Sequence, residues 1–289
     1  MLDATATDKV FAEAKDGGAG FDAVMHFAGL KAVGESVEQP IRYYDNNITG
    51  TLNLLKSMQK HDVKKIVFSS SATVYGDPGE VPADGLAEDL PTGQGITNPY
   101  GRTKYMIEEI LKDACVADGS FSATILRYFN PVGAHKSGKL GEDPNGRPNN
   151  LMPIVMKVAQ GVYPELSVYG NDYPTPDGTC VRDYIHVVDL AKGHVAAIRW
   201  TMENQGAEVF NLGTGTGYSV LDMVHAFIDT NRVPVPYEIV DRRPGDIGVC
   251  YADPAKSAEK LGWKAEKNLN DMVRDAWRWQ STNPMGYGQ

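Results

Sequence analysis

The chain of 289 residues carries 37 acidic and 28 basic side chains, a net charge of −9, and 42% of its residues are hydrophobic. This composition is typical of globular proteins and excludes collagen-like, disordered and disulfide-scaffold chains. The acidic balance argues against a nucleic-acid partner, because phosphate binding needs a basic face. No uncharged apolar run approaches the roughly 18 residues of a membrane span, and the first residues do not predict secretion. Three widely spaced cysteines, Cys115, Cys180 and Cys250, predict reduced thiols in a cytoplasmic protein.

The first half of the chain predicts strands that alternate with helices. Three short apolar runs are typical of buried strands; they are 21–29, 65–71 and 122–128. Two segments have apolar side chains at helical spacing; they are 43–59, with Ile48, Leu52 and Leu55 on one face, and 100–113. This alternation predicts a parallel, doubly wound α/β sheet.

The residue composition changes after Pro131. Residues 133–150, rich in Gly, Pro and Asn, predict an ordered loop or lid. Further elements are predicted as a helix at 151–160, a strand at 181–187, a helix to Trp200 and a strand at 208–212. Ser219 and Asp222 predict a capping box at the start of another helix. Gly213, Gly215 and Gly217 lack the G-x-G-x-x-G spacing of a dinucleotide loop, so we expect a plain strand-to-helix turn.

Tyr100 and Lys104 stand four residues apart at the start of a predicted helix. Such side chains share one face, so the ammonium can lie beside the phenol. A nearby cation lowers the tyrosine pKa, ordinarily near 10, and so prepares the phenol for acid–base chemistry. With 14 tyrosines in the chain, about one such pair is expected by chance. Taken alone, Tyr100 and Lys104 are better explained as two exposed side chains on one helix face than as a functional motif.

Three serines end the predicted strand at 65–71. Ligands of open parallel sheets bind outside the carboxyl ends of the strands. There the Ser71 hydroxyl can hydrogen-bond a substrate oxygen next to Tyr100. Serine-rich strand ends are common, but a strand, serines and then Tyr-x-x-x-Lys form a much rarer order.

Longer motifs resemble the extended short-chain dehydrogenase/reductase family. They are SSSATVYG at 69–76, PYGRTK at 99–104, RYFNP at 127–131, NNLMP at 149–153 and RDYIHV at 182–187. Within it, three more motifs resemble the UDP-glucose 4-epimerase family; they are HFAGLKAVGES at 26–36, RRPGD at 242–246 and WRWQS at 277–281. The resemblance covers essentially the whole chain, and the motifs come in the order of the family.

The resemblance implies an NAD-dependent interconversion of UDP-glucose and UDP-galactose through a 4-keto sugar. NAD takes a hydride from C4 and returns it on the other face, so it acts as a bound catalyst. Tyr100 removes the proton of the 4-hydroxyl group with the help of Lys104, and Ser71 hydrogen-bonds the same oxygen. A UDP-hexose is the implied partner, and helices 45–59 and 100–114 are the expected homodimer contact.

Two sets of residues are implied at the site. The NAD set is Phe27, Ala28, Gly29, Leu30, Lys31, Asn46, Ser71, Tyr100, Lys104 and Phe129. The UDP-sugar set is Lys31, Ser71, Tyr100, Asn130, Asn150, Leu151, Tyr169, Arg182, Arg243, Asp246 and Cys250. Arginine suits a diphosphate because its planar fork gives paired, charge-assisted hydrogen bonds.

The expected architecture is a Rossmann-like NAD domain, residues 1–130 and 181–217, with a smaller UDP-sugar lobe, residues 131–180 and 218–289. The family opens with a strand, a Gly-rich turn and a helix that hold the pyrophosphate, and the sequence contains no such opening. Met1 falls about where the third strand would end, so we expect an N-terminal truncation of roughly 55 to 60 residues. We expect weakened NAD binding by this chain.

Cys250 stands where some members of the family carry a tyrosine against the sugar. A small side chain leaves room for a 2-N-acetyl group, which predicts activity on UDP-N-acetylglucosamine and UDP-N-acetylgalactosamine as well. The plainer interpretation is a small, buried apolar residue.

Two other functions stay open. A nucleotide-sugar dehydratase or decarboxylase shares the scaffold, but a dehydratase needs an acid and a base at the strand end, where this chain has Ser71, Ala72 and Thr73. An inactive UDP-sugar-binding fragment is the second, because the Gly-rich NAD motif is absent. The six histidines have no ligand spacing, so we expect no metal site.

Overall fold

The computed structural model describes residues 1–146, 148–243 and 245–288. The helices are α1 (Ala4–Asp16), α2 (Val33–Glu38), α3 (Pro40–Tyr44), α4 (Gly50–Lys60), α5 (Pro99–Ala117), α6 (Leu151–Ala159), α7 (Val187–Glu203), α8 (Val220–Asn231), α9 (Ala255–Leu261) and α10 (Leu269–Thr282). A π-helical turn, η1 (Asp45–Thr49), joins α3 to α4, and a 3₁₀ turn, η2 (Ala72–Tyr75), follows β2. The strands are β1 (Val24–His26), β2 (Lys65–Ser71), β3 (Ser122–Tyr128), β4 (Asn130–Val132), β5 (Leu166–Tyr169), β6 (Val181–His186), β7 (Gly206–Leu212), β8 (Gly217–Ser219), β9 (Tyr237–Val240) and β10 (Val249–Cys250).

The central sheet is parallel and has the strand order β1-β2-β3-β7. Alternate side chains of a strand point to opposite faces, and both faces are apolar here. Ile66 and Phe68 pack against α1, α4 and α5, whereas Val67 and Leu126 pack on the other face with α7. Helices on both faces of a parallel sheet confirm the predicted α/β, doubly wound class.

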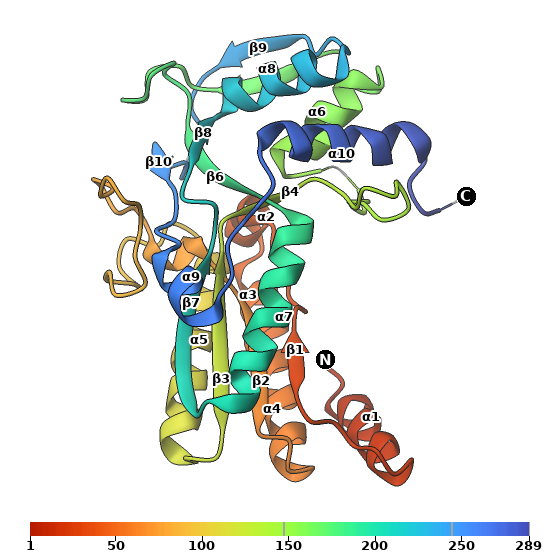
Figure 1. Ribbon diagram of the computed structural model, residues 1–289, viewed down its shortest axis with the longest axis vertical. Coiled ribbons are helices and arrows are strands. Elements are labelled where there is room, and N and C mark those ends of the chain that lie inside the picture. Colours follow the sequence, from red (N-terminus) through yellow and green to blue (C-terminus); the bar gives the residue numbers. More distant parts are fainter. Residues whose placement is uncertain (147, 244, 289) are drawn as a thin grey trace.

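A second part of the molecule lies beyond the carboxyl ends of the central strands, at the top of Figure 1. Here β6 pairs in parallel with β4 and β10 and antiparallel with β8, and β5 pairs with β9. Helices α6, α8 and α10 pack around a core that includes Met156, Phe227 and Met272. Of the expected NAD domain, β7 joins the central sheet while β6 belongs to this second part. The expected domain boundaries stay a prediction.

The predicted helix at 43–59 is interrupted by η1. A π-turn inserts a residue into a helix, and the face that follows is rotated. Leu54 and Met58 are therefore buried, while Leu52, expected on the apolar face, is exposed. The strands predicted at 65–71 and 122–128 have the expected bounds, and α5 extends beyond its predicted range at both ends.

The chain from 213 to 219 differs from its prediction in one detail. The glycine-rich turn leads into the short strand β8, so the expected direct passage from strand to helix was wrong. The capping box of Ser219 and Asp222 at the start of α8 is confirmed.

All three cysteines are buried with free thiols. Among the residues that the structure describes, no helix is both long and apolar enough to cross a membrane. The same part of the chain brings together no group of three or more side chains that could hold a metal ion.

Candidate active site

Tyr100 lies in the first turn of α5, and the local sequence fixes where this helix begins. The Asn98 side chain caps it by accepting the amide of Gly101 at 2.8 Å. Gly101 allows close approach to η2, because a Cβ there would lie 3.2 Å from the side chain of Thr73. The start of α5 is thereby held against the turn that follows Ser71.

Ser71 is the last residue of β2, and its Oγ accepts hydrogen bonds from both the amide and the hydroxyl group of Thr73, at 3.2 and 3.0 Å. Its lone pairs are therefore engaged, which leaves its own hydrogen to donate. Ser71 also lies close enough to the phenol of Tyr100 to influence the pKa of that group.

The ammonium of Lys104 is buried on the same face of α5 as Tyr100, as the four-residue spacing predicted. Its Nζ donates to the carbonyl of Ser69 at 2.5 Å. It lies 4.8 Å from the centre of the Phe68 ring and 5.9 Å from that of Tyr100. The structure thus brings the three predicted residues of the proton-transfer group together at the end of β2.

The pKa values correct one expectation. Burial raises the pKa of Tyr100, and its hydrogen bond with Ser71 opposes the rise. Burial lowers the pKa of Lys104 to about 8, while Glu108 acts in the opposite direction. The prediction that the lysine lowers the tyrosine pKa is wrong here, because the ammonium faces the Ser69 carbonyl and the desolvated phenol keeps its proton.

Residues 27–31 follow β1 at the same edge of the sheet. The Asn47 side chain holds them by accepting the amide of Leu30 at 2.8 Å and donating to its carbonyl at 3.0 Å. A Cβ at Gly29 would lie 3.3 Å from the Asn47 Oδ1 atom. Asn46 donates to Asn47 at 2.9 Å. Asn47, which is not among the predicted site residues, orders this loop.

Aromatic rings gather beyond β1 and β3. The side chain of Phe27 is 57% exposed, and its ring centre lies 4.8 Å from that of His194. His194 Nδ1 bonds the Leu190 carbonyl at 2.8 Å, so Nε2 accepts the hydrogen of the Tyr128 hydroxyl group. The contact between Tyr128 and His194 joins β3 to α7, so the sequence did not predict it.

Glu142 connects two residues of the predicted UDP-sugar set. Its Oε1 atom accepts from the Asn150 amide at 3.2 Å and lies 3.8 Å from the Lys31 ammonium. Asn150 precedes α6, and Leu151 is the first residue of that helix. Glu142 belongs to the predicted loop 133–150, but nothing in the sequence singled it out.

Arg182 and Cys250 are Cα partners in the parallel pairing of β6 and β10. Cys250 is buried in a cluster with Ala72 and Phe129, and burial raises the pKa of its thiol to about 11. Asn130 begins β4 beside this cluster and is exposed. Four predicted site residues therefore lie around the segment that leads from β3 into β4; they are Phe129, Asn130, Arg182 and Cys250.

A second group of predicted residues lies at the end of β5. The Arg243 guanidinium donates to both carboxylate oxygens of Asp246, at 2.9 and 3.2 Å. It also lies 5.4 Å from the centre of the Tyr169 ring. Pro244 of the same motif lies outside the described residues.

Comparison with known proteins places the chain in a family. The profile of the NAD dependent epimerase/dehydratase family matches residues 1–213. The UDP-glucose 4-epimerase of Bacillus subtilis is 59% identical over 287 residues, which cover 99% of this chain and 82% of that protein. The chain belongs to the NAD dependent epimerase/dehydratase family, among its UDP-glucose 4-epimerases. The human UDP-glucose 4-epimerase is 58% identical over 268 residues, which cover 93% of this chain and 76% of that protein.

The fold agrees with solved members of this family. The crystal structure of UDP-glucose 4-epimerase from Bifidobacterium longum in complex with NAD+ and UDP has a TM-score of 0.93 and 58% identity to this chain. The match covers 99% of this chain and 82% of that one. The predicted family and fold class are confirmed.

The glycine-rich turn after β7 is filled by a side chain of the epimerase chain itself. The buried carboxylate of Asp183 accepts the amides of Thr214, at 2.9 Å, and of Gly215, at 3.0 Å. It also accepts the Thr214 hydroxyl group at 2.7 Å and the Ala252 amide at 3.2 Å. The turn is therefore an internal anchor and not a phosphate loop.

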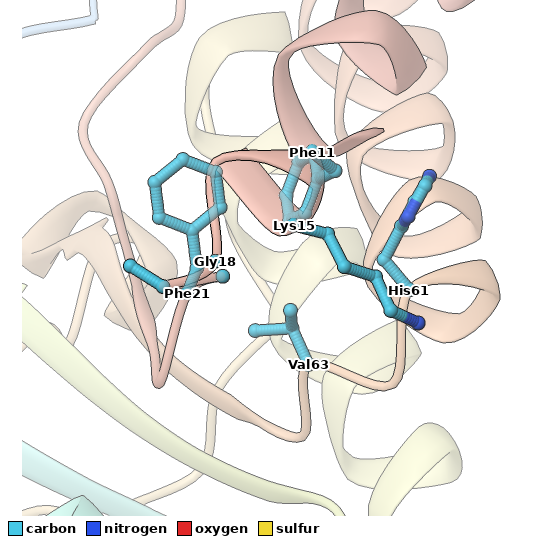
Figure 2. A pocket seen from close by; sticks show the side chains of 8 residues that line it. Phe11, Lys15, Gly18, Phe21, His61 and Val63 are labelled. Carbon is cyan, nitrogen blue, oxygen red and sulfur yellow. The ribbon is translucent and has the colours of Figure 1, made fainter. Parts of the chain in front are cut away.

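A cavity of about 240 Å³ lies away from these residues, beside α1 (Figure 2). Phe11, Phe21 and Val63 give it apolar walls, and Lys15 and His61 lie at its edge. Val63 precedes β2, so the cavity is at the opposite end of that strand from Ser71. It holds none of the predicted site residues.

Proposed function

We propose that this chain interconverts UDP-glucose and UDP-galactose with NAD as a bound catalyst. The observation that carries the proposal is the convergence of Ser71, Tyr100 and Lys104 at the carboxyl end of β2, in a chain 59% identical to a UDP-glucose 4-epimerase. When bound, NAD supplies a hydride acceptor that later returns the hydride, and a positive charge close to the phenol.

The residues around this point suit such a cofactor. The exposed ring of Phe27 offers an apolar surface. Because Gly29 has no Cβ, its backbone can lie close to the Asn47 side chain. An ammonium has three donors; Lys104 gives one to Ser69, which leaves donors for ribose hydroxyl groups. Residues 27–31, with Asn46 and Phe129, would hold NAD.

Tyr100 is the proposed proton acceptor and donor. It takes the proton of the 4-hydroxyl group and returns it after the 4-keto sugar has presented its other face. Because the Tyr100 pKa is raised in the structure, the phenol needs the nearby positive charge to act as a base. Ser71 donates its hydrogen to the same sugar oxygen, and the remaining donors of Lys104 would bind the ribose hydroxyl groups.

The turning of the sugar requires a firm grip on the UDP moiety and a loose one on the hexose. Arginine binds phosphate oxygens in pairs, which suits Arg182 and Arg243 to the diphosphate. The remaining proposed UDP-sugar contacts are Lys31, Asn130, Asn150, Leu151, Tyr169 and Asp246. Tyr169, 40% exposed, offers a ring surface to the nucleotide.

We further propose that UDP-N-acetylglucosamine and UDP-N-acetylgalactosamine are substrates. The short side chain of Cys250 clusters with Ala72, the residue after Ser71. A cysteine occupies less volume at this position than a tyrosine would.

A dehydratase is disfavoured by the residues at the end of β2. Dehydration needs an acid and a base there, and residues 71–73 are Ser, Ala and Thr.

The test is to incubate the purified chain with NAD and UDP-galactose deuterated at C4, and to analyse the products by mass spectrometry and NMR. We expect UDP-glucose that keeps the deuterium at C4. A 4-keto-6-deoxy sugar would indicate a dehydratase. Binding of UDP-galactose in calorimetry without any product would indicate the inactive UDP-sugar binder.

A homodimer through α4 and α5 and a cytoplasmic location complete the proposal. Light scattering of the purified chain tests the first, and fractionation of the producing cell tests the second.

A further inference from the structure

A buried ion pair lies one helical turn beyond Lys104 and has no part in the chemistry described so far. The carboxylate of Glu108 accepts Arg127 Nε at 3.1 Å and Nη2 at 2.8 Å, and both side chains are at most 2% exposed. The Ser70 hydroxyl group donates to the same carboxylate at 2.5 Å. A buried charged pair is costly unless it is well hydrogen-bonded, and here each guanidinium nitrogen and both carboxylate oxygens have a partner.

The pair connects the elements that carry the proposed proton-transfer group. Tyr100, Lys104 and Glu108 repeat every four residues and so share one face of α5. Ser70 lies between Ser69, whose carbonyl accepts Lys104, and Ser71. Ser70 and Arg127 are Cα partners in the pairing of β2 and β3.

Arg127 extends this connection to the turn after Ser71. Its guanidinium lies 4.8 Å from the centre of the Tyr75 ring, and its Nη1 donates to the Glu88 carbonyl at 3.1 Å. The Tyr75 hydroxyl group donates to Asn211 Oδ1 at 2.7 Å. The network therefore holds η2 and the end of β2 to the neighbouring strands.

We propose that Glu108 is a positioning residue, whose carboxylate, held by Ser70 and Arg127, fixes Tyr100 and Lys104 against the end of β2. The proposal deepens the epimerase function and rests on it.

The groups around Lys104 make the effect of Glu108 specific. On α5 these are Glu108 and Tyr100. From β1, His26 faces the lysine, and its pKa of about 4 leaves it neutral at working pH. From β3, Tyr128 lies near Tyr100, and burial keeps its phenol protonated. From β3, the Arg127 guanidinium also lies here and is paired with Glu108. Glu108 is an anionic group that opposes the loss of charge caused by burial of Lys104.

The variants separate this role from plain stabilisation. Glu108→Gln alone leaves Arg127 buried and unpaired, so the principal variant is the pair Glu108→Gln with Arg127→Met, which removes both charges at similar volume. The matched control is Glu109→Gln, the next residue of α5, whose carboxylate pairs on the surface with Lys112 at 2.7 Å.

The first readout is the titration of Lys104 followed by NMR of ¹³Cε-labelled lysine, with Lys104→Met to assign the signal. It needs neither substrate nor turnover. We expect the midpoint to fall in the pair variant and to stay unchanged in Glu109→Gln. The lower pKa should also move the alkaline fall of kcat to lower pH, with KM for UDP-galactose little changed.

A folded pair variant with the wild-type midpoint and wild-type pH profile would overturn the proposal, even if its Tm were lower. If the pair variant does not fold, Ser70→Ala decides, because it keeps both charges; we expect a lower kcat at unchanged KM, and an unchanged kcat overturns the positioning role. Failure of the epimerase function itself would appear separately, as a wild-type chain without turnover, while the lysine titration would still report on Glu108.

Discussion

The His26 ring donates from Nε2 to the Thr51 hydroxyl oxygen at 2.9 Å, where β1 meets α4. The direction follows from the next bond, because Thr51 gives its own hydrogen to the Asn47 carbonyl at 2.6 Å. Asn47 in turn orders the Leu30 loop. A neutral histidine therefore supports the loop proposed to hold the cofactor.

This histidine predicts a loss of stability in acid. Burial, with the charge of Lys104, lowers the pKa of His26 from 6.5 to about 4. Between these values the unfolded chain binds the proton and the folded chain does not, so the free energy of unfolding falls as pH falls from about 6.5 to 4. The loss from this group is on the order of 3 kcal/mol.

Urea denaturation at a series of pH values measures this effect. His26→Gln keeps an amide donor for Thr51 and should show a flatter dependence than the wild type over the same window. The exposed His225→Gln is the control and should follow the wild type. Equal slopes for wild type and His26→Gln would contradict the prediction.

Removal of the Tyr100 hydroxyl group should reduce turnover without loss of nucleotide binding. General acid–base groups contribute about 10²- to 10⁴-fold to a rate, so we expect Tyr100→Phe to lower kcat by that order. Ser71→Ala should cost less, since it removes one hydrogen bond to the same oxygen. Steady-state kinetics with UDP-galactose and calorimetry with UDP measure the two effects. Tyr105→Phe, on the next turn of α5, is the control and should keep full activity; a Tyr100→Phe variant that equals it would refute the role.

The anchored turn after β7 predicts a large stability effect of Asp183. Its carboxylate accepts from Thr214, Gly215 and Ala252. An asparagine at this position would place its NH2 group against the N–H groups that now donate to Asp183. Buried hydrogen-bonding groups would then be left unpaired, at a cost of about 3 kcal/mol. Asp183→Asn should show this loss in urea denaturation, whereas the exposed Asp229→Asn should not. A loss of the same size in both would mean that the turn is not the cause.

The central strands could be predicted from the sequence, and the reason is burial on both faces. β2 and β3 each have an apolar centre with polar residues at both ends, a pattern typical of a strand buried on both faces. Strands of two to four residues carry no usable period, which is why β5, β9 and β10 were missed. The first helix, α1, was also not predicted, and η1 shifted the buried face of α4 by an insertion that periodicity does not reveal.

In the candidate site, too, some residues could be predicted from the sequence and others could not. Helical spacing singled out Tyr100 and Lys104, the strand end singled out Ser71, and the family resemblance supplied their roles. Glu142, Asp183 and the pair of Glu108 and Arg127 act through partners far away in the sequence, so only the folded chain shows their contacts. The raised pKa of Tyr100 was missed for a related reason, because spacing does not report desolvation.

Enlargement of Cys250 should change which sugars are accepted. Cys250→Tyr places a bulky ring next to Ala72 and should lower kcat/KM for UDP-N-acetylgalactosamine at least about 10-fold relative to UDP-galactose. Cys250→Ala keeps a small side chain and should retain both activities. Thermal unfolding checks that the larger side chain has not disrupted the core. Parallel losses for both sugars in a folded Cys250→Tyr protein would remove the specificity role.

The Glu142 carboxylate should compete with the UDP-sugar for Lys31 and Asn150. Its carboxylate engages Lys31 and Asn150, which are both proposed to bind the UDP-sugar, and the substrate is an anion that needs the same donors. A partly exposed ion pair is worth about 0.2–1 kcal/mol, so Glu142→Gln should tighten UDP binding by up to about 5-fold. Calorimetry measures this, and the gain should shrink as salt rises. The control is Asp143→Asn, whose carboxylate accepts the Tyr287 amide at 2.8 Å and should leave the affinity unchanged. Weaker UDP binding by Glu142→Gln would instead mean that the carboxylate orients Lys31 for the ligand.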